Sequence, residues 1–251
     1  MIKRNIYFLI LSFLLLITLN QSSFSQFDKD FNISFGVVTT SILGDNRAKL
    51  PMVATDDSEN AYTGGSFGYS QPGFSLKANI RDDENKIRYG IGVDYLLFSG
   101  RERINITGGR IVHYLMHDVN ILSFGADFNY VLLELDFANA KIYTGIEAKM
   151  YYLHNISAQV KEDWLEIDKM DNLITHPPKP NAFRFGGSVK AGIEGRLRKK
   201  LYVNTGLAVG LINLLGRDDE RGELLTPLRL FEDKESYVPT LQVFISLQYY
   251  L

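Results

Sequence analysis

The sequence predicts an all-β protein: an eight-stranded antiparallel up-and-down transmembrane β-barrel with short periplasmic turns and long extracellular loops. Three observations predict this fold class. The chain begins with the pattern of an export signal, eight later segments alternate apolar and polar side chains, and the links between those segments are short and long by turns.

Residues 1–25 have the pattern of a cleaved secretory signal peptide. Two cations precede an apolar run of about 14 residues, which is shorter than the roughly 20 residues of a membrane-spanning helix. Ser23 and Ser25 occupy the third and first positions before a cleavage point at Gln26, where small residues are required. We therefore expect residues 26–251 to form the exported barrel domain.

The composition of the remaining chain excludes several classes of function. Its formal net charge of −4 does not indicate a nucleic-acid partner, which requires a strongly basic face. The absence of cysteine excludes a disulfide framework and a Cys-based zinc site. No apolar run after the signal approaches the roughly 20 residues of a spanning helix, so a membrane-embedded chain would have to cross as a closed sheet.

Eight segments of about ten residues alternate apolar and polar positions, as a strand with two unlike faces does. In residues 183–197 the odd-numbered positions are apolar or glycine, whereas Arg184, Lys190, Glu194 and Arg196 are all at even positions. Ten residues is the length that a tilted strand needs to cross a bilayer. The segments are 31–39, 73–81, 87–98, 122–132, 142–152, 183–197, 201–211 and 241–251.

The links between these segments alternate in length. The links after the second, fourth and sixth segments are short: 81–86, 134–140 and 198–200. The links after the first, third, fifth and seventh are long: 41–70, 99–120, 154–182 and 212–238. This alternation is typical of outer-membrane barrels, whose short turns and chain termini lie on the periplasmic side.

The polar faces are expected to line the inside of the barrel. Eight strands leave an interior just wide enough for side chains to fill, and an unpaired charge buried there is costly. We therefore expect a salt-bridged, plugged lumen, in which the strand register decides which acid meets which base. The expected polar network of the lumen is Lys77, Arg81, Arg88, Asp94, Asp127, Glu147, Lys149, Arg184, Lys190, Glu194 and Arg196.

The apolar faces are expected to contact lipid. They are nearly uninterrupted in all eight segments, and aromatic residues occur near their ends, as in an interfacial girdle. The polar faces carry many glycines, which weaken a water-exposed strand but fit the crowded inside of a narrow barrel. The expected lipid-facing girdle is Phe31, Phe74, Tyr89, Tyr95, Tyr130, Tyr152, Phe183 and Tyr249.

These features, with the terminal strand VFISLQYYL, resemble the small eight-stranded outer-membrane barrels, a group that includes OmpX-like proteins and the OmpA transmembrane domain. The stretch QPGFSLKANI and the SFSQ cleavage region are most similar to the PorT-like outer-membrane barrels of Bacteroidota. The resemblance implies a protein integral to a bacterial outer membrane, and a link to protein secretion. Tyr249 and Leu251 also resemble the C-terminal signal that barrel-assembly machinery recognises, so lipid and that machinery are the expected partners.

Two pairs of residues were considered as catalytic or metal-binding candidates. His113 and His117 fall in a predicted strand that follows a turn at 104–109, where residues four apart are roughly 13 Å apart and cannot share one ion. His154 and Ser157 are the residue types of an acyl-transfer site, but they lie on opposite faces of a regular strand. We therefore expect no enzyme activity, no metal and no cofactor.

The long links are the best candidates for binding a protein partner, because loops on a rigid scaffold usually carry function. Trp164, Ile167, Met170 and Ile174 fit one stripe of a short amphipathic helix within 161–174, and residues 216–225 form a charged run. The predicted role is a scaffold, adhesion or envelope/secretion-assembly component that acts through its extracellular loops. The alternatives are a narrow channel for small solutes, a lipid-modifying enzyme, and a soluble lipocalin-like barrel.

Overall fold

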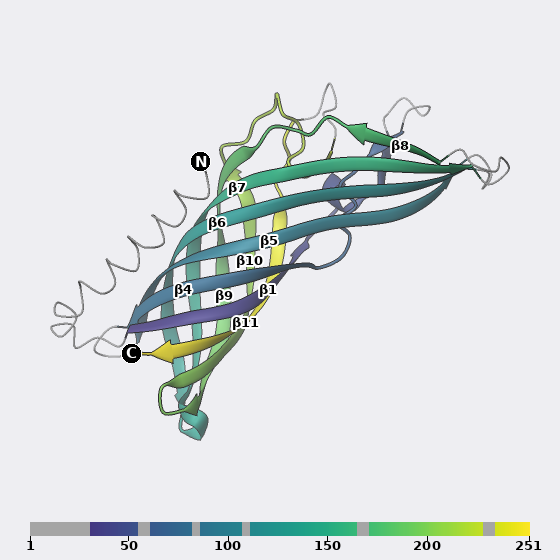
Figure 1. The fold of residues 1–251 in the computed structure, drawn as a ribbon. Coiled ribbons are helices and arrows are strands. Elements are labelled where there is room, and N and C mark those ends of the chain that lie inside the picture. The colour runs from purple at the N-terminus through teal and green to yellow at the C-terminus, as the bar shows by residue number, and fades with distance from the viewer. Residues whose placement is uncertain (1–30, 55–60, 82–85, 107–110, 165–170, 228–233) are drawn as a thin grey trace, which may run out of the picture.

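The computed structural model describes residues 31–54, 61–81, 86–106, 111–164, 171–227 and 234–251, so the predicted signal peptide lies outside the described residues. These residues form a ring of eight antiparallel strands (Figure 1), which confirms the predicted fold class. The described helices are two three-residue 3-10 helices, η2 (Arg47–Lys49) and η4 (Phe137–Asn139). Within the described ranges, no helix has the length and hydropathy needed to cross a membrane.

Each predicted segment lies in one strand of the ring, except that Leu251 follows the end of the last strand. The strands are β1 (Phe31–Ile42), β4 (Gln71–Arg81), β5 (Ile87–Ile106), β6 (Ile111–Leu135), β7 (Ala140–Trp164), β9 (Ala182–Arg198), β10 (Leu201–Leu215) and β11 (Pro239–Tyr250). Neighbours along the chain pair with each other, and β1 closes the ring on β11, with Asn32 opposite Tyr250 and Ile42 opposite Thr240. Closure leaves no open edge within the ring itself.

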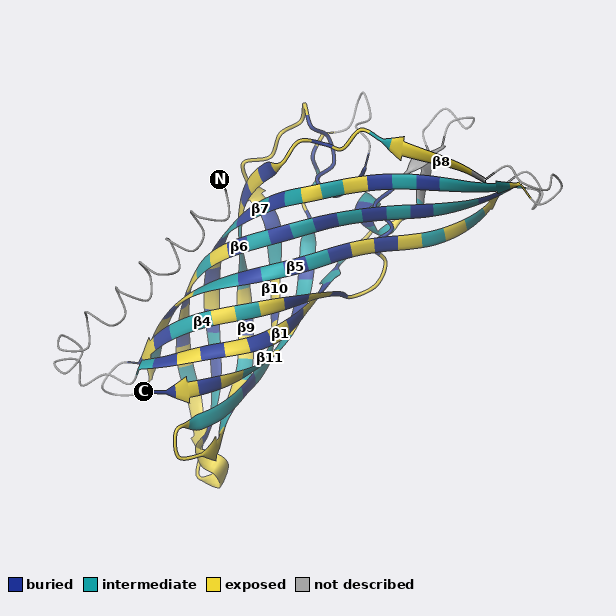
Figure 2. Ribbon diagram, viewed as in Figure 1, coloured by how far each residue is buried: buried dark blue, intermediate teal, exposed yellow. Residues whose placement is uncertain are grey.

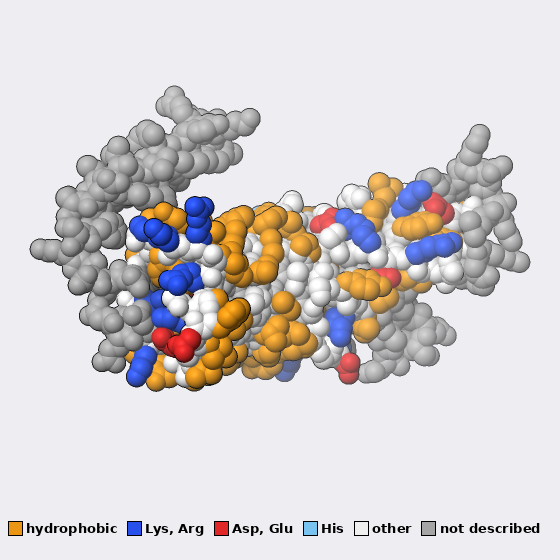
Figure 3. Space-filling model, turned by 90° about the horizontal axis from the view of Figure 1, so that it is seen from below, with side chains coloured by type: hydrophobic (Ala, Val, Ile, Leu, Met, Phe, Trp, Pro, Cys, Tyr) orange, Lys and Arg blue, Asp and Glu red, His pale blue; other side chains and the backbone are white. Residues whose placement is uncertain are grey.

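Buried and exposed residues alternate along the strands of the ring (Figure 2). The exposed face is the apolar one, which is the reverse of a water-soluble sheet. Along β1, Asn32 and Ser34 are buried, whereas Ile33 and Phe35 are 43% and 60% exposed. The same alternation continues around the ring, and apolar side chains cover its outer wall (Figure 3). A soluble lipocalin-like barrel requires the opposite arrangement, with apolar side chains lining the interior.

Three strands of the ring, β5 from residue 97, β6 to residue 120 and β7 from residue 154, continue beyond it as a projecting sheet (Figure 1). A fourth strand, β8 (Asp171–His176), joins this sheet, which we call the extension. In the extension, β5 and β6 pair as far as Ile106 opposite Ile111, and among the described strands β8 pairs only with β7. The predicted long links 99–120 and 154–182 are therefore largely strand, and the strands of the hairpin expected around 104–109 are confirmed.

The prediction of an amphipathic helix within 161–174 is wrong at both ends of that range. Trp164 is the last residue of strand β7, and Ile174 lies in strand β8. Ile167 and Met170 lie outside the described residues. Val160 pairs with Ile174, so backbone groups of β7 and β8 find their partners across the sheet. This pairing outweighs the weak helical spacing of the apolar residues in the sequence.

The first and last long links fold over the mouth of the ring, at the end opposite the short turns. The first contains η2 and the short strands β2 (Met52–Ala54) and β3 (Ala61–Thr63). Phe67 from this link and Leu224 and Leu225 from the last link are almost completely buried, in one apolar core with Phe98 of β5. We call this core the mouth plug.

The mouth plug depends on close backbone approach at Gly100, where a Cβ would lie 2.6 Å from the carbonyl oxygen of Gly65. Gly100→Ala should therefore loosen residues 64–67 and cost about 1–3 kcal/mol, the range for overpacking. Amide exchange of residues 64–67 and the free energy of unfolding measure the effect. Gly195→Ala is the matched control, because a Cβ there meets no atom within 4 Å; equal effects of the two substitutions would contradict the assigned contact.

Candidate functional site

The lumen is filled by ion pairs that join non-adjacent strands. At the turn end, Glu194 of β9 is 1% exposed and accepts hydrogen bonds from Arg81 of β4, at 2.6 Å, and from Arg88 of β5. The Tyr250 hydroxyl of β11 donates to the same carboxylate at 2.8 Å. The Arg88 guanidinium lies 4.6 Å from the centre of the Tyr143 ring. One carboxylate thus links four strands of the ring.

Halfway along the lumen, Lys190 of β9 forms an ion pair with Asp127 of β6. Asn129, two residues along β6, donates to the same carboxylate at 2.5 Å. Asp127 and Lys190 are 7% and 5% exposed, so their pairing offsets part of the cost of burying both charges.

Nearer the mouth, the carboxylate of Glu147 of β7 forms ion pairs with two lysines. Its Oε1 is 2.5 Å from Nζ of Lys77, and its Oε2 is 3.0 Å from Nζ of Lys149. Lys149 also contacts Asp94 of β5 at 2.7 Å. These groups border a cavity of about 40 Å³, which has room for a few water molecules but not for a solute.

Each of the four acids in the lumen therefore contacts at least one cation. Nine of the expected lumen residues lie there, and two lie elsewhere. Arg196 is exposed at the turn end, because β9 runs past the closed part of the ring. Arg184 is buried at the mouth and faces the last long link instead of an acid in a strand.

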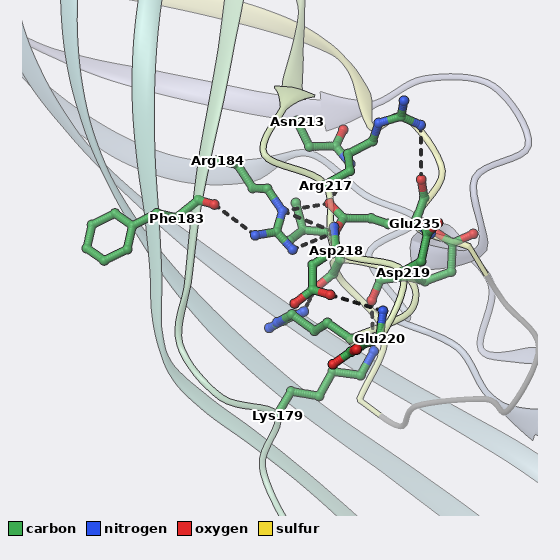
Figure 4. A network of polar contacts seen from close by, with 12 residues as sticks. Lys179, Phe183, Arg184, Asn213, Arg217, Asp218, Asp219, Glu220 and Glu235 are labelled. Carbon is green, nitrogen blue, oxygen red and sulfur yellow. Dashed lines mark hydrogen bonds and ion pairs between the residues drawn. The ribbon is translucent and has the colours of Figure 1, made fainter.

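Arg184 forms a two-pronged contact with Glu235, whose carboxylate is fully buried (Figure 4). Asn213 of β10 also donates to Glu235, at 2.8 Å, and the backbone N–H of Asp218 donates at 2.9 Å. This network fixes the last link across the mouth. The sequence did not single out Glu235, because it lies in a charged loop and its partner is 51 residues away. The charged run 216–225 has an exposed part followed by buried residues from Arg221.

The eight expected girdle residues lie on the outer side of the ring at two levels. Near the mouth, Phe74 is opposite Tyr95, and Tyr152 is opposite Phe183, with stacked rings 4.5 Å apart. The other four, Phe31, Tyr89, Tyr130 and Tyr249, lie toward the turn end. All eight are exposed or partly exposed.

His113 and His117 both lie in β6, within the extension, and make different contacts. Nε2 of His113 is 3.1 Å from Oε1 of Glu162, which lies in the neighbouring strand β7. His117 is 2% exposed, and its Nδ1 is 3.1 Å from the Gly65 carbonyl oxygen. Burial lowers the pKa of His117 from its ordinary value to about 4. Among the described residues, no group of three metal-ligating side chains comes together.

His154 and Ser157 lie on the same face of β7, not on opposite faces as expected. A β-bulge at Asn155, whose φ is +52°, places Asn155 and Ile156 opposite the single residue Val119 of β6. As a result, His154 is paired with Asn120 and Ser157 with Asp118, which share one face of β6. The His154 ring stacks on Tyr152 at 5.4 Å. Within this described strand no hydrogen bond joins His154 to Ser157.

The fold and this interior define a closed, ion-filled eight-stranded β-barrel with a capped mouth. No protein-family model matches the sequence, and no curated protein matches it. Among solved structures, Neisserial surface protein A is similar with a TM-score of 0.45 and 11% identity, over 88% of this chain and 97% of that chain. Ail, the attachment invasion locus protein of Yersinia pestis, has a TM-score of 0.42 and 10% identity in its complex with a heparin analogue, over 89% and 99%.

Removing the central carboxylate of the turn-end cluster should strongly destabilise the barrel. Glu194→Gln removes the buried carboxylate that Arg81 and Arg88 both contact, which should cost about 3–5 kcal/mol. Urea unfolding, followed by the fraction of unheated protein that migrates as the folded band, measures this. Glu134→Gln is the control: the Glu134 side chain is exposed and lies 3.2 Å from Lys141, so its loss should cost below about 1 kcal/mol.

Docking of the first link onto the extension should weaken in acid. Because the pKa of His117 is lowered to about 4, the unfolded state binds a proton that the folded state excludes as pH falls from about 6.5 to about 4. Stability is therefore full above that window and drops by about 3 kcal/mol across it. Amide exchange of residues 64–67 between pH 7 and 4.5 measures the loss. His117→Asn should abolish the pH dependence, and His113→Gln should retain it; the reverse pattern would contradict the assignment.

Proposed function

We propose that this protein is a non-enzymatic integral outer-membrane β-barrel that holds the extension and the mouth links outside the cell as a scaffold, adhesion or envelope-assembly component. The observation that carries the proposal is the reversal of the two faces of the ring. Large apolar side chains such as Phe35, Ile91 and Ile146 are 60%, 67% and 61% exposed, directly opposite a charged interior. Water would disfavour such a wall, whereas lipid stabilises it.

The interior argues against a role as a solute channel. The ion pairs fill the lumen, and the mouth plug adds an apolar layer that includes Phe98 and Leu153, both at most 1% exposed. Moving an ion through this interior would require breaking several buried charge pairs. The barrel is therefore better suited to anchor an outer structure than to conduct.

The extension is the part best suited to contact a protein partner. The backbone N–H of Ser99 donates to the side chain of Gln71, and this contact ends the pairing of β5 with β4. Beyond Ser99, the edge of β5 that carries Arg101 and Arg103 pairs with no described strand. The other edge of the extension is β8, where Leu173 is 56% exposed. Open edges accept an added strand from a partner. The resemblance to PorT-like barrels favours envelope or secretion assembly as the setting.

The absence of cysteine allows a direct test of orientation. Asn105→Cys, in the exposed part of the extension, should react on intact cells with a membrane-impermeant maleimide. Lys199→Cys, in the short turn between β9 and β10, should react only after the outer membrane is opened. The folded barrel should fractionate with the outer membrane and shift on a denaturing gel when boiled.

Three results would contradict the proposal. Recovery from the soluble periplasm without a heat shift would remove the membrane assignment. Equal labelling of both cysteines on intact cells would reverse or abolish the orientation. Stable ion conductance of the folded barrel in planar bilayers would contradict a closed anchor.

A further inference from the structure

The outer wall of the ring has a shallow groove of about 390 Å³ over β7, β9, β10 and β11. Its floor is made by the small side chains of Ala191 and Thr205, and the larger side chains of Ile142, Ile193, Leu207 and Val243 border it. The groove is apolar and open along its length. It therefore has the character of a seat for a hydrocarbon chain.

The same two strands, β9 and β10, end in a cluster of cations at the turn end. Arg196, Arg198, Lys199 and Lys200 are all exposed, and within the part of the chain that the structure describes none of them pairs with an acid. Glu134 in the neighbouring turn is already paired with Lys141. Figure 3 shows Lys and Arg side chains gathered at this end of the molecule, beside the apolar wall.

The register connects the cations to the groove. On β10, Leu201 and Tyr202 are consecutive, but their partners on β9 are Arg198 and Arg196. Leu197 is therefore the extra residue of a β-bulge. Because of this bulge, Arg198 lies on the same outward face as Leu201. Between Arg198 and Ala191 the outer side of β9 carries Leu197, Gly195 and Ile193, and a Cβ at Gly195 would meet nothing within 4 Å. An apolar strip with a gap at Gly195 therefore leads from the cations to the groove.

The length of this path matches one leaflet of a membrane. Arg198 and Ala191 are opposite Leu201 and Leu207, so they lie six register steps apart, or roughly 20 Å along the strand. At a tilt of roughly 40° this is about 15 Å along the membrane normal, about half of a hydrocarbon core roughly 30 Å thick. A phosphate at the cations would thus place its acyl chain in the groove.

We propose that the β9–β10 hairpin binds an anionic phospholipid of the inner leaflet. Its phosphate contacts the cations of residues 196–200, and one acyl chain follows Gly195 into the groove at Ala191 and Thr205. The proposal rests on the membrane location proposed above. An acidic protein segment would satisfy the charges but would leave the groove and the exposed Leu197 unused; a phospholipid uses both.

The test uses the full chain, purified as the folded, heat-shifted barrel in uncharged detergent. Native mass spectrometry with phosphatidylglycerol and with phosphatidylcholine of the same acyl chains measures lipid retention. Phosphatidylglycerol should be retained at least about tenfold more strongly, since each nearby cation contributes roughly fivefold. Arg198→Gln with Lys200→Gln should lower its retention by roughly fivefold per charge, and added salt should have a similar effect.

Two further variants separate a built site from general attraction. Ala191→Phe fills the groove and should weaken retention of both lipids without changing the salt dependence. The controls are Lys86→Gln, an exposed cation in another turn, and Ala126→Phe, an exposed alanine on β6; both should match the natural chain.

Equal retention of the two lipids would overturn the proposal, as would a loss of retention in the controls as large as in the hairpin variants. These results are distinguishable from failure of the membrane assignment, because in that case the natural chain would give no heat-shifted folded barrel at all.

Discussion

Glu194 holds two arginines from neighbouring strands and the tyrosine of the last strand, in an interior that buries all four side chains almost completely. Comparable pairs repeat toward the mouth, at Asp127 and at Glu147. A charge removed from water must find an opposite charge, so every one of these contacts restricts where its strand can lie. The register of the whole ring, and with it both faces of every strand, depends on this neutralisation.

The outer wall follows from the same constraint. Because side chains alternate, a shift of one strand by one residue would turn its charges outward and its apolar residues into the lumen. Closure of β1 on β11 then leaves no backbone edge within the ring, and the apolar wall can meet lipid without an unpaired backbone group. The interior that fixes the register also fills the lumen, so one set of residues specifies the fold and closes the barrel.

The two ends of the barrel differ because different interactions organise them. At the turn end the chain reverses in a few residues, and the cations 196–200 remain exposed. At the mouth, the links pack on each other through Phe67, Leu224 and Leu225, and Glu235 ties the last link to β9. This packing covers one side of the projecting strands, while their outer edges remain open. The barrel thus joins a rigid anchor to an outer sheet that can contact a partner.

The sequence by itself determined the strands, their antiparallel order and which residues lie on each face, because period-two alternation is a local property of the chain. Of the eleven charged residues that it predicts for the lumen, nine lie there in the structure. Only the tertiary structure decided which acid meets which cation, since pairing depends on the register between strands far apart in sequence. It likewise decided that residues 161–164 and 171–174 are strands, that Arg184 turns to Glu235, and that a bulge at Asn155 brings His154 and Ser157 to one face. Each of these results from contacts between distant segments, which leave no periodic signal in the sequence.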